Sequence, residues 1–314
     1  MTADNFWLAT NDRSGLFVNR WLPDRSAKAI VLLAHGMAEH GGRYARLGKA
    51  LNTAGFGLYA HDQRGHGITA KHGTLGHFAD NDGWHTVVSD LACVQQHINQ
   101  THLGLPVFLL GHSMGSYITQ AYLLHHSASL QGAILSASNC QPAMLYRAAR
   151  WIARLERLRQ GPKGRSALIE WLSFGSFNNA FKPNRTRFDW LSRDPDQVDA
   201  YENDPLCGFR CTNQLWLDLL SGLEHISHVA NLSQIDPNVP LLLIGGECDP
   251  VSEGKRLNDL ANALRAAGCR QLTLTVYPQA RHELFNETNR DAVTSDVIEW
   301  LNTALSHPRP ARSE

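Results

Sequence analysis

The sequence has no excess of charge of either sign, because 29 lysines and arginines balance 29 aspartates and glutamates in 314 residues. Nucleic-acid-binding proteins usually carry a strong basic excess. The balance therefore argues against nucleic acid as a partner. At 43% apolar residues, the chain can still build a sizeable core.

Cysteine is also scarce, with six residues, of which only Cys207 and Cys211 lie close together. A zinc site would need a second pair of ligands, and the sequence offers none at a matching spacing. Seven histidines fall between His35 and His85, but none has the H-x-x-x-H spacing of a helical metal site. We therefore expect reduced cysteines and neither a metal nor a cofactor.

Long apolar runs are missing as well. The longest, at 29–34 and 241–244, are far too short to span a bilayer. The first fifteen residues have neither the basic nor the apolar region of a signal peptide, so we expect a cytoplasmic protein. The polar tail at 307–314 is expected to have no regular structure. Nothing in the sequence indicates the oligomeric state.

Short apolar runs alternate with amphipathic ones along most of the chain. Two alternating stretches at 6–10 and 16–23 predict a β-hairpin. Apolar runs bounded by glycine then predict buried parallel strands, and the segments between them predict helices. The strands are expected at 29–36, 55–62, 106–113, 130–138, 239–246 and 271–278, and the helices at 44–54, 84–99, 116–126, 256–267 and 292–305. The pattern predicts an α/β fold: a mostly parallel, doubly wound sheet preceded by an antiparallel hairpin.

The alternation stops at Asn139. From there to His228 we expect only amphipathic helices, as in 144–157 and 213–223, where apolar residues recur on one helical stripe. We predict a core formed by residues 1–138 and 229–314, and a helical cap at 139–228. Insertions of this kind lie over the carboxyl ends of the strands, where ligands bind in open α/β sheets.

Gly111-His112-Ser113-Met114-Gly115 lies where a predicted strand meets a predicted helix. This Gly-x-Ser-x-Gly pattern, in that setting, is typical of a nucleophile elbow, a sharp turn that exposes the serine hydroxyl. The alternative is a plain Gly/Ser turn. We predict that Ser113 is a nucleophile.

A nucleophilic serine needs a base and an acid that orients the base. Asp249 and His282 each follow a predicted strand, in the chain order that this fold requires. Glu247 competes with Asp249, but the Asp249-Pro250 pair places the aspartate in the turn beyond the strand. We predict Asp249 as the acid, His282 as the base and Glu247 as a structural hydrogen-bond acceptor.

The oxyanion of an acyl-transfer reaction needs two N–H donors. The residue after the nucleophile is Met114, and His35-Gly36 places Met37 after an earlier strand. We therefore predict the Met37 and Met114 amides as the oxyanion hole. We also expect Gly36, His112, Trp151 and Trp216 to contact the substrate. The segment HDQRGHG, at 61–67, is expected to form a hydrogen-bonded loop beneath the site.

The segments AHGMAEHGGRY, HDQRGHG, LLGHSMGS and YPQARHELFNE resemble the α/β-hydrolases of the monoacylglycerol lipase and lysophospholipase group, also described as serine aminopeptidase-like. The resemblance covers 29–138 and 239–285. It implies the Ser113–His282–Asp249 triad, the Met37 and Met114 oxyanion hole and a helical cap. One departure is Ser116, where the group usually has a glycine.

We expect a serine hydrolase for carboxylic esters with an apolar acyl group, such as a monoacylglycerol, a lysophospholipid or a medium-chain ester. An aminopeptidase or amidase with the same triad is the main alternative, with Glu202 and Asp204 as candidates to hold a substrate ammonium group. A non-catalytic binding module is a weaker alternative, because such proteins usually lack a triad member.

Seven basic residues and one acid lie between Arg147 and Arg165. Four of the arginines recur at helical spacing opposite the stripe that contains Trp151. A basic amphipathic helix at 144–159 could lie on an anionic membrane. The alternative is a solvated outer face with the apolar stripe packed on the pocket.

Overall fold

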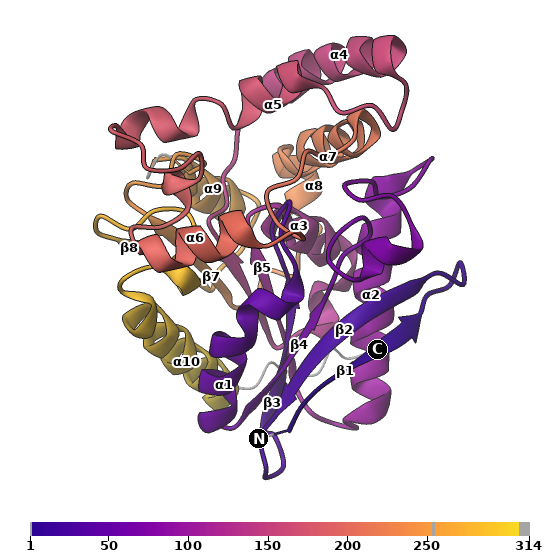
Figure 1. Cartoon of the computed structure of the whole chain (residues 1–314). Coiled ribbons are helices and arrows are strands. Elements are labelled where there is room, and N and C mark those ends of the chain that lie inside the picture. Colours follow the sequence, from indigo (N-terminus) through magenta and orange to yellow (C-terminus); the bar gives the residue numbers. More distant parts are fainter. Residues whose placement is uncertain (1, 253–254, 308–314) are drawn as a thin grey trace.

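The computed structural model describes residues 2–252 and 255–307 and contains one eight-stranded sheet (Figure 1). The tail at 308–314, for which no regular structure was expected, lies outside the described residues. The strand order is β1-β2-β4-β3-β5-β6-β7-β8. The strands are β1 (Thr2–Ala9), β2 (Gly15–Leu22), β3 (Ala29–Ala34), β4 (Phe56–His61), β5 (Val107–His112), β6 (Gly132–Ser136), β7 (Leu241–Gly246) and β8 (Leu272–Tyr277).

The first two strands form the expected hairpin, and β2 pairs antiparallel with β4. All the other pairs are parallel. Every residue of β3 to β7 is buried, as expected for parallel strands that are covered on both faces. The fold class predicted from the alternating pattern is confirmed.

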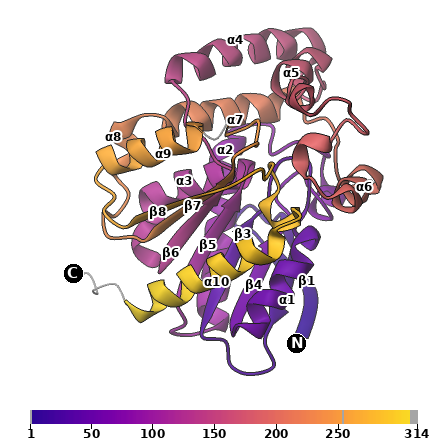
Figure 2. The same ribbon diagram turned by 90° about the vertical axis from the view of Figure 1, so that its left-hand side faces the viewer.

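Helices cover both faces of the sheet. On one face lie α1 (Ala45–Thr53) and α10 (Arg290–Ser306), seen in front of the strands in Figure 2. On the other face lie α2 (Gly83–Thr101), α3 (Met114–His126) and α9 (Lys255–Ala266). The shorter elements of the core are η1 (Gly41–Tyr44), η2 (Thr69–His72), η3 (Ser127–Ser129), α8 (Val229–Leu232) and η6 (Leu284–Asn286).

Residues 139–228, called the cap segment below, lie between β6 and β7 and contain no strand, all of them being described. The segment lies above the sheet in Figures 1 and 2. It comprises α4 (Ala143–Gln160), α5 (Ala167–Ser173), η4 (Phe177–Phe181), η5 (Asp189–Leu191), α6 (Pro195–Asn203) and α7 (Asn213–Ile226).

The apolar stripe of α4 packs inward only along one edge, where Leu145, Ala148 and Ile152 line the cavity described below. The side chain of Trp151 is 63% exposed, and that of Leu155 is 62% exposed. The buried face instead carries Ala153 and Glu156, and it packs against α7. Small residues allow this close approach, whereas the larger side chains of the stripe would keep the two helices apart.

Two arginines of α4 also face α7. Arg147 Nε lies 2.6 Å from Glu224 Oε1, and Arg150 forms an ion pair with the same carboxylate. These guanidinium groups therefore join the two helices and are not all turned toward solvent. None of the helices in the described ranges combines the length and the hydropathy needed to cross a bilayer.

Candidate active site

Ser113 lies between β5 and α3 with φ 51° and ψ −119°. A positive φ is uncommon for a residue with a side chain and signals a strained turn. The Ser113 amide donates to the carbonyl of Ser136 on the neighbouring strand at 2.9 Å, which holds the turn in place. The backbone has the sharp strand-to-helix geometry that was predicted for a nucleophile elbow.

The flanking glycines are required by the close approach of backbone segments. A Cβ atom on Gly115 would lie 2.0 Å from the carbonyl oxygen of Ala34. A Cβ on Gly111 would lie 2.4 Å from the carbonyl oxygen of Gly115. Both distances are far below van der Waals contact, so only glycine allows α3 to start so close to β3 and β5.

Ser116, the departure from the group's usual glycine, fits without disturbing the turn. Its side chain is fully buried, and its hydroxyl donates to the Ser113 carbonyl at 2.6 Å. The same oxygen lies 2.8 Å from Ser138 Oγ. The hydroxyl therefore adds a hydrogen bond to the elbow.

His282 and Asp249 form a buried pair. His282 Nδ1 lies 2.9 Å from Asp249 Oδ1. Asp249 is 1% exposed, and its carboxylate also accepts from the Val251 amide and the Ser252 hydroxyl. These bonds fix the carboxylate, so the imidazole carries its proton on Nδ1 and leaves Nε2 as an acceptor.

Glu247, the competing acid, has a different partner. Its Oε2 accepts from the Gln279 amide at 2.9 Å. Gln279 has a positive φ of 58°. Glu247 thus supports the turn before His282 and has the structural role that was expected of it.

The environment of His282 favours its protonated form. Burial by itself lowers the pKa of the imidazole, but the charge and the hydrogen bond of Asp249 outweigh burial, so the pKa lies above its ordinary value. The ring of Trp190 lies against the imidazole, with 5.0 Å between the ring centroids. Stabilisation of the imidazolium is what a general base needs at the moment it takes a proton.

The loop after β3 lies beside Ser113. A Cβ on Gly36 would be 3.4 Å from Ser113 Cβ. Met37 and Met114 both line the cavity that contains Ser113. Ala38, the residue after Met37, has φ 54°. Its carbonyl accepts from Tyr201 Oη at 2.9 Å and from the Gly208 amide at 3.0 Å. The cap segment therefore holds this loop.

A buried charge cluster lies next to the two loops and was not predicted from the sequence. Arg43 donates to Glu39 Oε2 at 2.7 Å and to both carboxylate oxygens of Glu283 at 2.6 Å. Burial by itself raises the pKa of Glu39, but Arg43 and the Gly36 amide outweigh it and keep the pKa below its usual value. The only signal in the sequence is that charged residues occur inside apolar motif segments.

A cavity of about 1060 Å³ contains Ser113 and His282 and extends under the cap segment. Gly36, His112 and Trp216, which we predict to contact the substrate, line this cavity. Trp151 does not, and its inclusion in the pocket was wrong, because its side of α4 faces solvent. Most of the wall on the cap side is apolar, with Ala148, Ile152, Phe174, Leu219, Leu220 and Leu223.

The HDQRGHG segment supports the loop after β3. Gln63 donates from its side chain to the His35 carbonyl at 2.6 Å, and its amide donates to His35 Nε2 at 3.0 Å. Asp62 accepts from the Gly41 and Ile68 amides. The segment therefore forms the hydrogen-bonded loop that was expected beneath the site.

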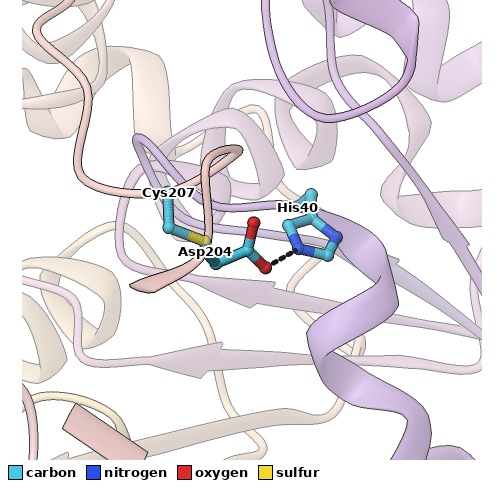
Figure 3. Close-up of side chains that lie close together, drawn as sticks. All are labelled: His40, Asp204 and Cys207. Atoms are coloured by element: carbon cyan, nitrogen blue, oxygen red, sulfur yellow. Dashed lines mark hydrogen bonds and ion pairs between the residues drawn. The ribbon is translucent and has the colours of Figure 1, made fainter. Parts of the chain in front are cut away.

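One group of possible metal ligands occurs in the described ranges: His40, Asp204 and Cys207, with ligand atoms within 4.8 Å of one another (Figure 3). The Gly42 amide donates to His40 Nδ1, so the ring proton is on Nε2, which faces Asp204 at 2.9 Å. Burial raises the pKa of the Cys207 thiol. Metal binding would need a bare Nε2 and a thiolate, so we assign this contact as a hydrogen bond between the loop and the cap segment.

A mostly parallel α/β sheet with a serine at a strained strand-to-helix turn and a buried Asp–His pair at the ends of two later strands defines an α/β-hydrolase. The chain belongs to the family described as serine aminopeptidase S33, whose sequence profile matches residues 25–289. The resemblance drawn from the sequence motifs is thereby confirmed.

Similar proteins cover nearly the whole chain. A monoacylglycerol lipase of Mycolicibacterium smegmatis is 29% identical over 290 residues, which are 91% of this chain and 92% of that protein. The monoglyceride lipase of Mus musculus is 29% identical over 313 residues, 96% of this chain and 89% of the mouse protein. The crystal structure of a thermostable carboxyl esterase from Bacillus coagulans, in complex with glycerol, superposes with a TM-score of 0.89 at 26% identity and covers 97% of this chain and 99% of the esterase.

Proposed function

We propose that this protein is a serine hydrolase that cleaves carboxylic esters with an apolar acyl group. One observation carries the proposal: Ser113, at its strained turn, shares an apolar cavity with a His282 that is bound to a buried Asp249. The names of the relatives, monoacylglycerol lipase and carboxyl esterase, support the same class of reaction.

In the proposed mechanism, His282 Nε2 takes the proton of the Ser113 hydroxyl as Oγ attacks the ester carbonyl. The Met37 and Met114 amides donate to the oxyanion that forms. The C–O bond to the alcohol then breaks, and His282 gives its proton to the leaving oxygen. Water, deprotonated by His282, hydrolyses the acyl-enzyme and returns Ser113 to its starting state.

The charged residues of the cavity bear on the polar end of the substrate. Glu39 and Glu283 both line the cavity, and their two negative charges face the single positive charge of Arg43. This cluster would repel a phosphate group, but Arg187 and Arg210 line the same cavity together with Glu170 and would attract one. The lining therefore fits a monoacylglycerol, a medium-chain ester or a lysophospholipid, and the substrate panel below has to distinguish them.

The aminopeptidase alternative loses the acidic residues first considered for it. Glu202 is exposed on α6, and Asp204 is bound to His40; neither lines the cavity. Glu39 and Glu283 do line the cavity, but both are already bound by Arg43. Glu170 also lines it, but burial raises the pKa of Glu170, which disfavours the charged form that a substrate ammonium would need. The apolar wall and these occupied carboxylates favour the ester.

A fluorophosphonate probe tests the proposal, because only an activated serine is labelled. We expect the wild-type protein to be labelled and the Ser113→Ala variant to stay folded but unlabelled, with no turnover of p-nitrophenyl esters. Comparable turnover by the variant would overturn the assignment of the nucleophile, and an unlabelled wild type would support a non-catalytic binding module. A panel of p-nitrophenyl esters from C2 to C16, set beside amino-acyl anilides, separates esterase from amidase.

We further propose that residues 139–228 act as a cap that contacts lipid aggregates. The exposed large apolar side chains of α4 form one stripe, of which Leu145 and Ile152 also line the cavity: Met144, Leu145, Trp151, Ile152, Leu155 and Leu158. On α5, Leu168, Trp171 and Leu172 are exposed as well. A contiguous apolar surface of this kind is typical of a membrane or protein contact. We propose contact through this stripe in place of contact through the basic face, of which Arg147 and Arg150 pair with Glu224 while Arg154 and Arg157 stay exposed.

A further inference from the structure

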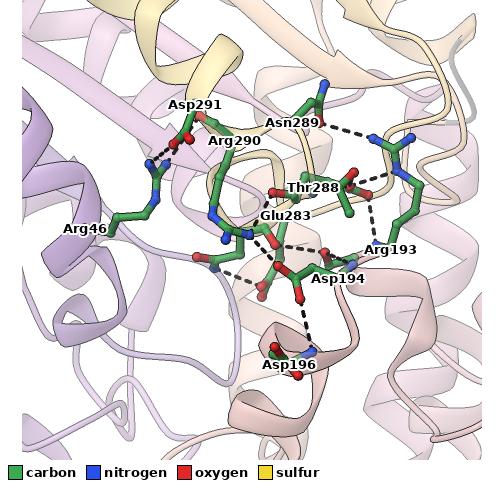
Figure 4. Close-up of polar contacts among 12 residues, drawn as sticks. Arg46, Arg193, Asp194, Asp196, Glu283, Thr288, Asn289, Arg290 and Asp291 are labelled. Carbon is green, nitrogen blue, oxygen red and sulfur yellow. Dashed lines mark hydrogen bonds and ion pairs between the residues drawn. The ribbon is translucent and has the colours of Figure 1, made fainter.

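Residues 280–290, called the histidine loop, carry His282 and pack against residues 189–194 of the cap segment, called the strap. The Glu283 amide donates to the Leu191 carbonyl at 2.8 Å. Ser192 Oγ donates to the Asn286 carbonyl at 2.8 Å. Figure 4 shows the outer side of this contact, where Arg290 binds Asp194 and Arg193 reaches Asn289. These bonds join two segments that lie about ninety residues apart in sequence, next to the predicted general base His282.

Glu287 lies at the centre of this contact and is 0% exposed. Its Oε1 accepts from the Arg281 amide at 2.9 Å and from the Arg193 amide at 3.1 Å. Its Oε2 accepts from Arg193 Nε at 2.9 Å and from the Thr288 amide at 2.7 Å. One buried carboxylate therefore joins the residue before His282, the strap and its own loop.

The bond to Arg281 completes a series along the backbone around His282. The Ala280 carbonyl accepts from the Cys248 amide at 2.9 Å, which ties the loop to the segment that carries Asp249. His282 itself is bound to Asp249, and Glu283 to Leu191. Each of the four consecutive residues has a different partner, and at Arg281 that partner is Glu287.

The strap also limits where the imidazole can lie. Trp190, whose ring packs on His282, is flanked by the carbonyls of Asp189 and Ser192, and the Arg281 guanidinium donates to both, at 2.5 and 3.1 Å. Through Arg193, Glu287 fixes the same strap. The position of the His282 imidazole is thus fixed through its own backbone and by Trp190 on its ring face. Glu287 binds both the backbone next to His282 and the strap that carries Trp190.

We propose that Glu287 is a positioning residue for the reaction: it fixes the orientation of His282 through the Arg281 amide and holds the strap, with Trp190, against the imidazole. This inference rests on the proposed function, because it assigns a role to His282 as base. It also gives the cap segment a second role, since the strap then supports the catalytic histidine.

Glu287→Gln is the sharpest test, because it keeps the size of the side chain but presents an NH2 group to surrounding N–H donors. Glu287 does not line the described cavity, so substrate binding should be unaffected. Misplacement of a catalytic group by about 1 Å can cost roughly 100-fold in rate. We expect kcat for p-nitrophenyl butyrate, per site labelled by the fluorophosphonate probe, to fall roughly 10- to 100-fold, with KM within about 2-fold of wild type.

Glu156→Gln is the matched control. Glu156 is also a buried acid, bound to Arg159 and Gln160, but it lies on α4, away from the histidine loop. We expect it to keep the wild-type kcat per labelled site. A merely structural role of Glu287 would lower the number of labelled sites and leave kcat per site unchanged, and that result would overturn the inference.

If Glu287→Gln does not fold, Arg193→Gln carries the test, because it removes the cap-side guanidinium and leaves the Arg281 bond intact. We expect kcat per labelled site to fall roughly 3- to 10-fold at unchanged KM; an unchanged kcat would overturn the inference. Failure of the probe to label wild-type protein would overturn the proposed function itself, and it is seen before any variant is made.

Discussion

At the scale of single residues, the hydrogen-bond partners of Asp249 and Glu247 distinguish the roles of these two neighbouring carboxylates. The aspartate binds the imidazole of His282, and the glutamate binds the backbone of Gln279. In a Ser–His–Asp triad, an asparagine in place of the aspartate stabilises the wrong imidazole tautomer. The two positions therefore allow the triad to be tested with the same kind of change two residues apart.

We expect Asp249→Asn to lower kcat by roughly 10³- to 10⁴-fold. The new NH2 group would donate to Nδ1 of His282, so the ring proton would lie on Nε2, which could then no longer accept the proton of Ser113. Glu247→Gln should keep activity within about 3-fold, since its amide oxygen can still accept from the Gln279 amide. Steady-state kinetics on a p-nitrophenyl ester, with folding checked by circular dichroism, measures both. Equal losses in the two variants would contradict the assignment of the acid.

The raised pKa of His282 predicts the pH dependence of the reaction. The base must be neutral, and a raised pKa means that it becomes protonated at a higher pH than a free histidine, whose pKa is about 6.5. Activity should therefore be lost as the pH falls, with a midpoint of kcat/KM above about 6.5. A profile measured from pH 5 to 9 with a neutral ester gives this midpoint, and a midpoint below about 6 would contradict the prediction.

At the scale of elements, the exposed stripe of α4 makes a prediction about lipid binding. Burial of a Trp or Leu side chain contributes about 1.5–3 kcal/mol. We expect Trp151→Ser with Leu158→Ser to weaken binding to phosphatidylcholine vesicles at least roughly 10-fold in a co-sedimentation assay, with unchanged turnover of a soluble ester.

Leu103→Ser provides the control for the stripe. Leu103 is 84% exposed, much like Leu158 at 83%, but it follows α2 in the core. This variant should bind vesicles as the wild type does. Equal binding by the double variant and the wild type, or binding only when anionic lipid is present, would show that the stripe is not the contact.

The helix that carries this stripe also shows where prediction from sequence stopped. Helical periodicity placed Leu145, Trp151 and Leu155 on one stripe, but it could not say whether that stripe faces the core or solvent. In the structure, α4 packs on α7 through the face that carries Ala149 and Ala153, because these small residues allow the two helices to approach closely. The strands β3 to β7 were predicted well, because each is a mostly apolar run that ends at or near a glycine or a polar residue, whereas β1 begins at Thr2, before the stretch predicted for it.

The candidate site was predicted from the ends of those strands, where Ser113, Asp249 and His282 occur in the order that the fold requires. Its supporting residues were not predicted. Arg43 meets Glu283, and Arg193 meets Glu287, across long stretches of sequence. No local pattern encodes such pairs, since they follow from tertiary packing; Arg43, Glu283 and Glu287 lie inside the motif segments, but Arg193 lies outside them.

At the scale of the whole molecule, buried histidines couple the stability of the fold to pH. Burial lowers the pKa of His61, His66 and His112 to about 4. Among the described residues, His61 Nδ1 and His66 Nε2 have no hydrogen-bond partner. Each ring is therefore buried in its neutral form, and a proton on it would be a buried charge.

The unfolded chain binds these protons near pH 6.5, whereas the folded chain binds them only near pH 4. Between those values the unfolded state holds more protons, so the free energy of unfolding must fall as the pH is lowered. Asp218 acts in the opposite direction, because burial raises its pKa to about 6. Each buried histidine adds up to one proton to this difference, or roughly 1.4 kcal/mol per pH unit, and His35 belongs to the same set because burial holds its pKa well below the ordinary value.

Urea unfolding at pH 7.5, 6.0 and 5.0 measures this slope, and His66→Phe isolates one contribution. The ring of His66 packs beside His35 and Phe209, with 5.4 Å between centroids in both pairs, so phenylalanine fits the site. The variant loses the Nδ1 bond to the Arg64 carbonyl and should be about 1 kcal/mol less stable at pH 7.5. Its stability should nevertheless fall less steeply with acid, by roughly 1.4 kcal/mol per pH unit, because one proton has been removed from the balance.

His85→Gln, at an exposed position of α2, should keep the wild-type slope. If His66→Phe also kept it, His66 would already be charged in the folded protein, and the acid sensitivity would have to arise from other groups.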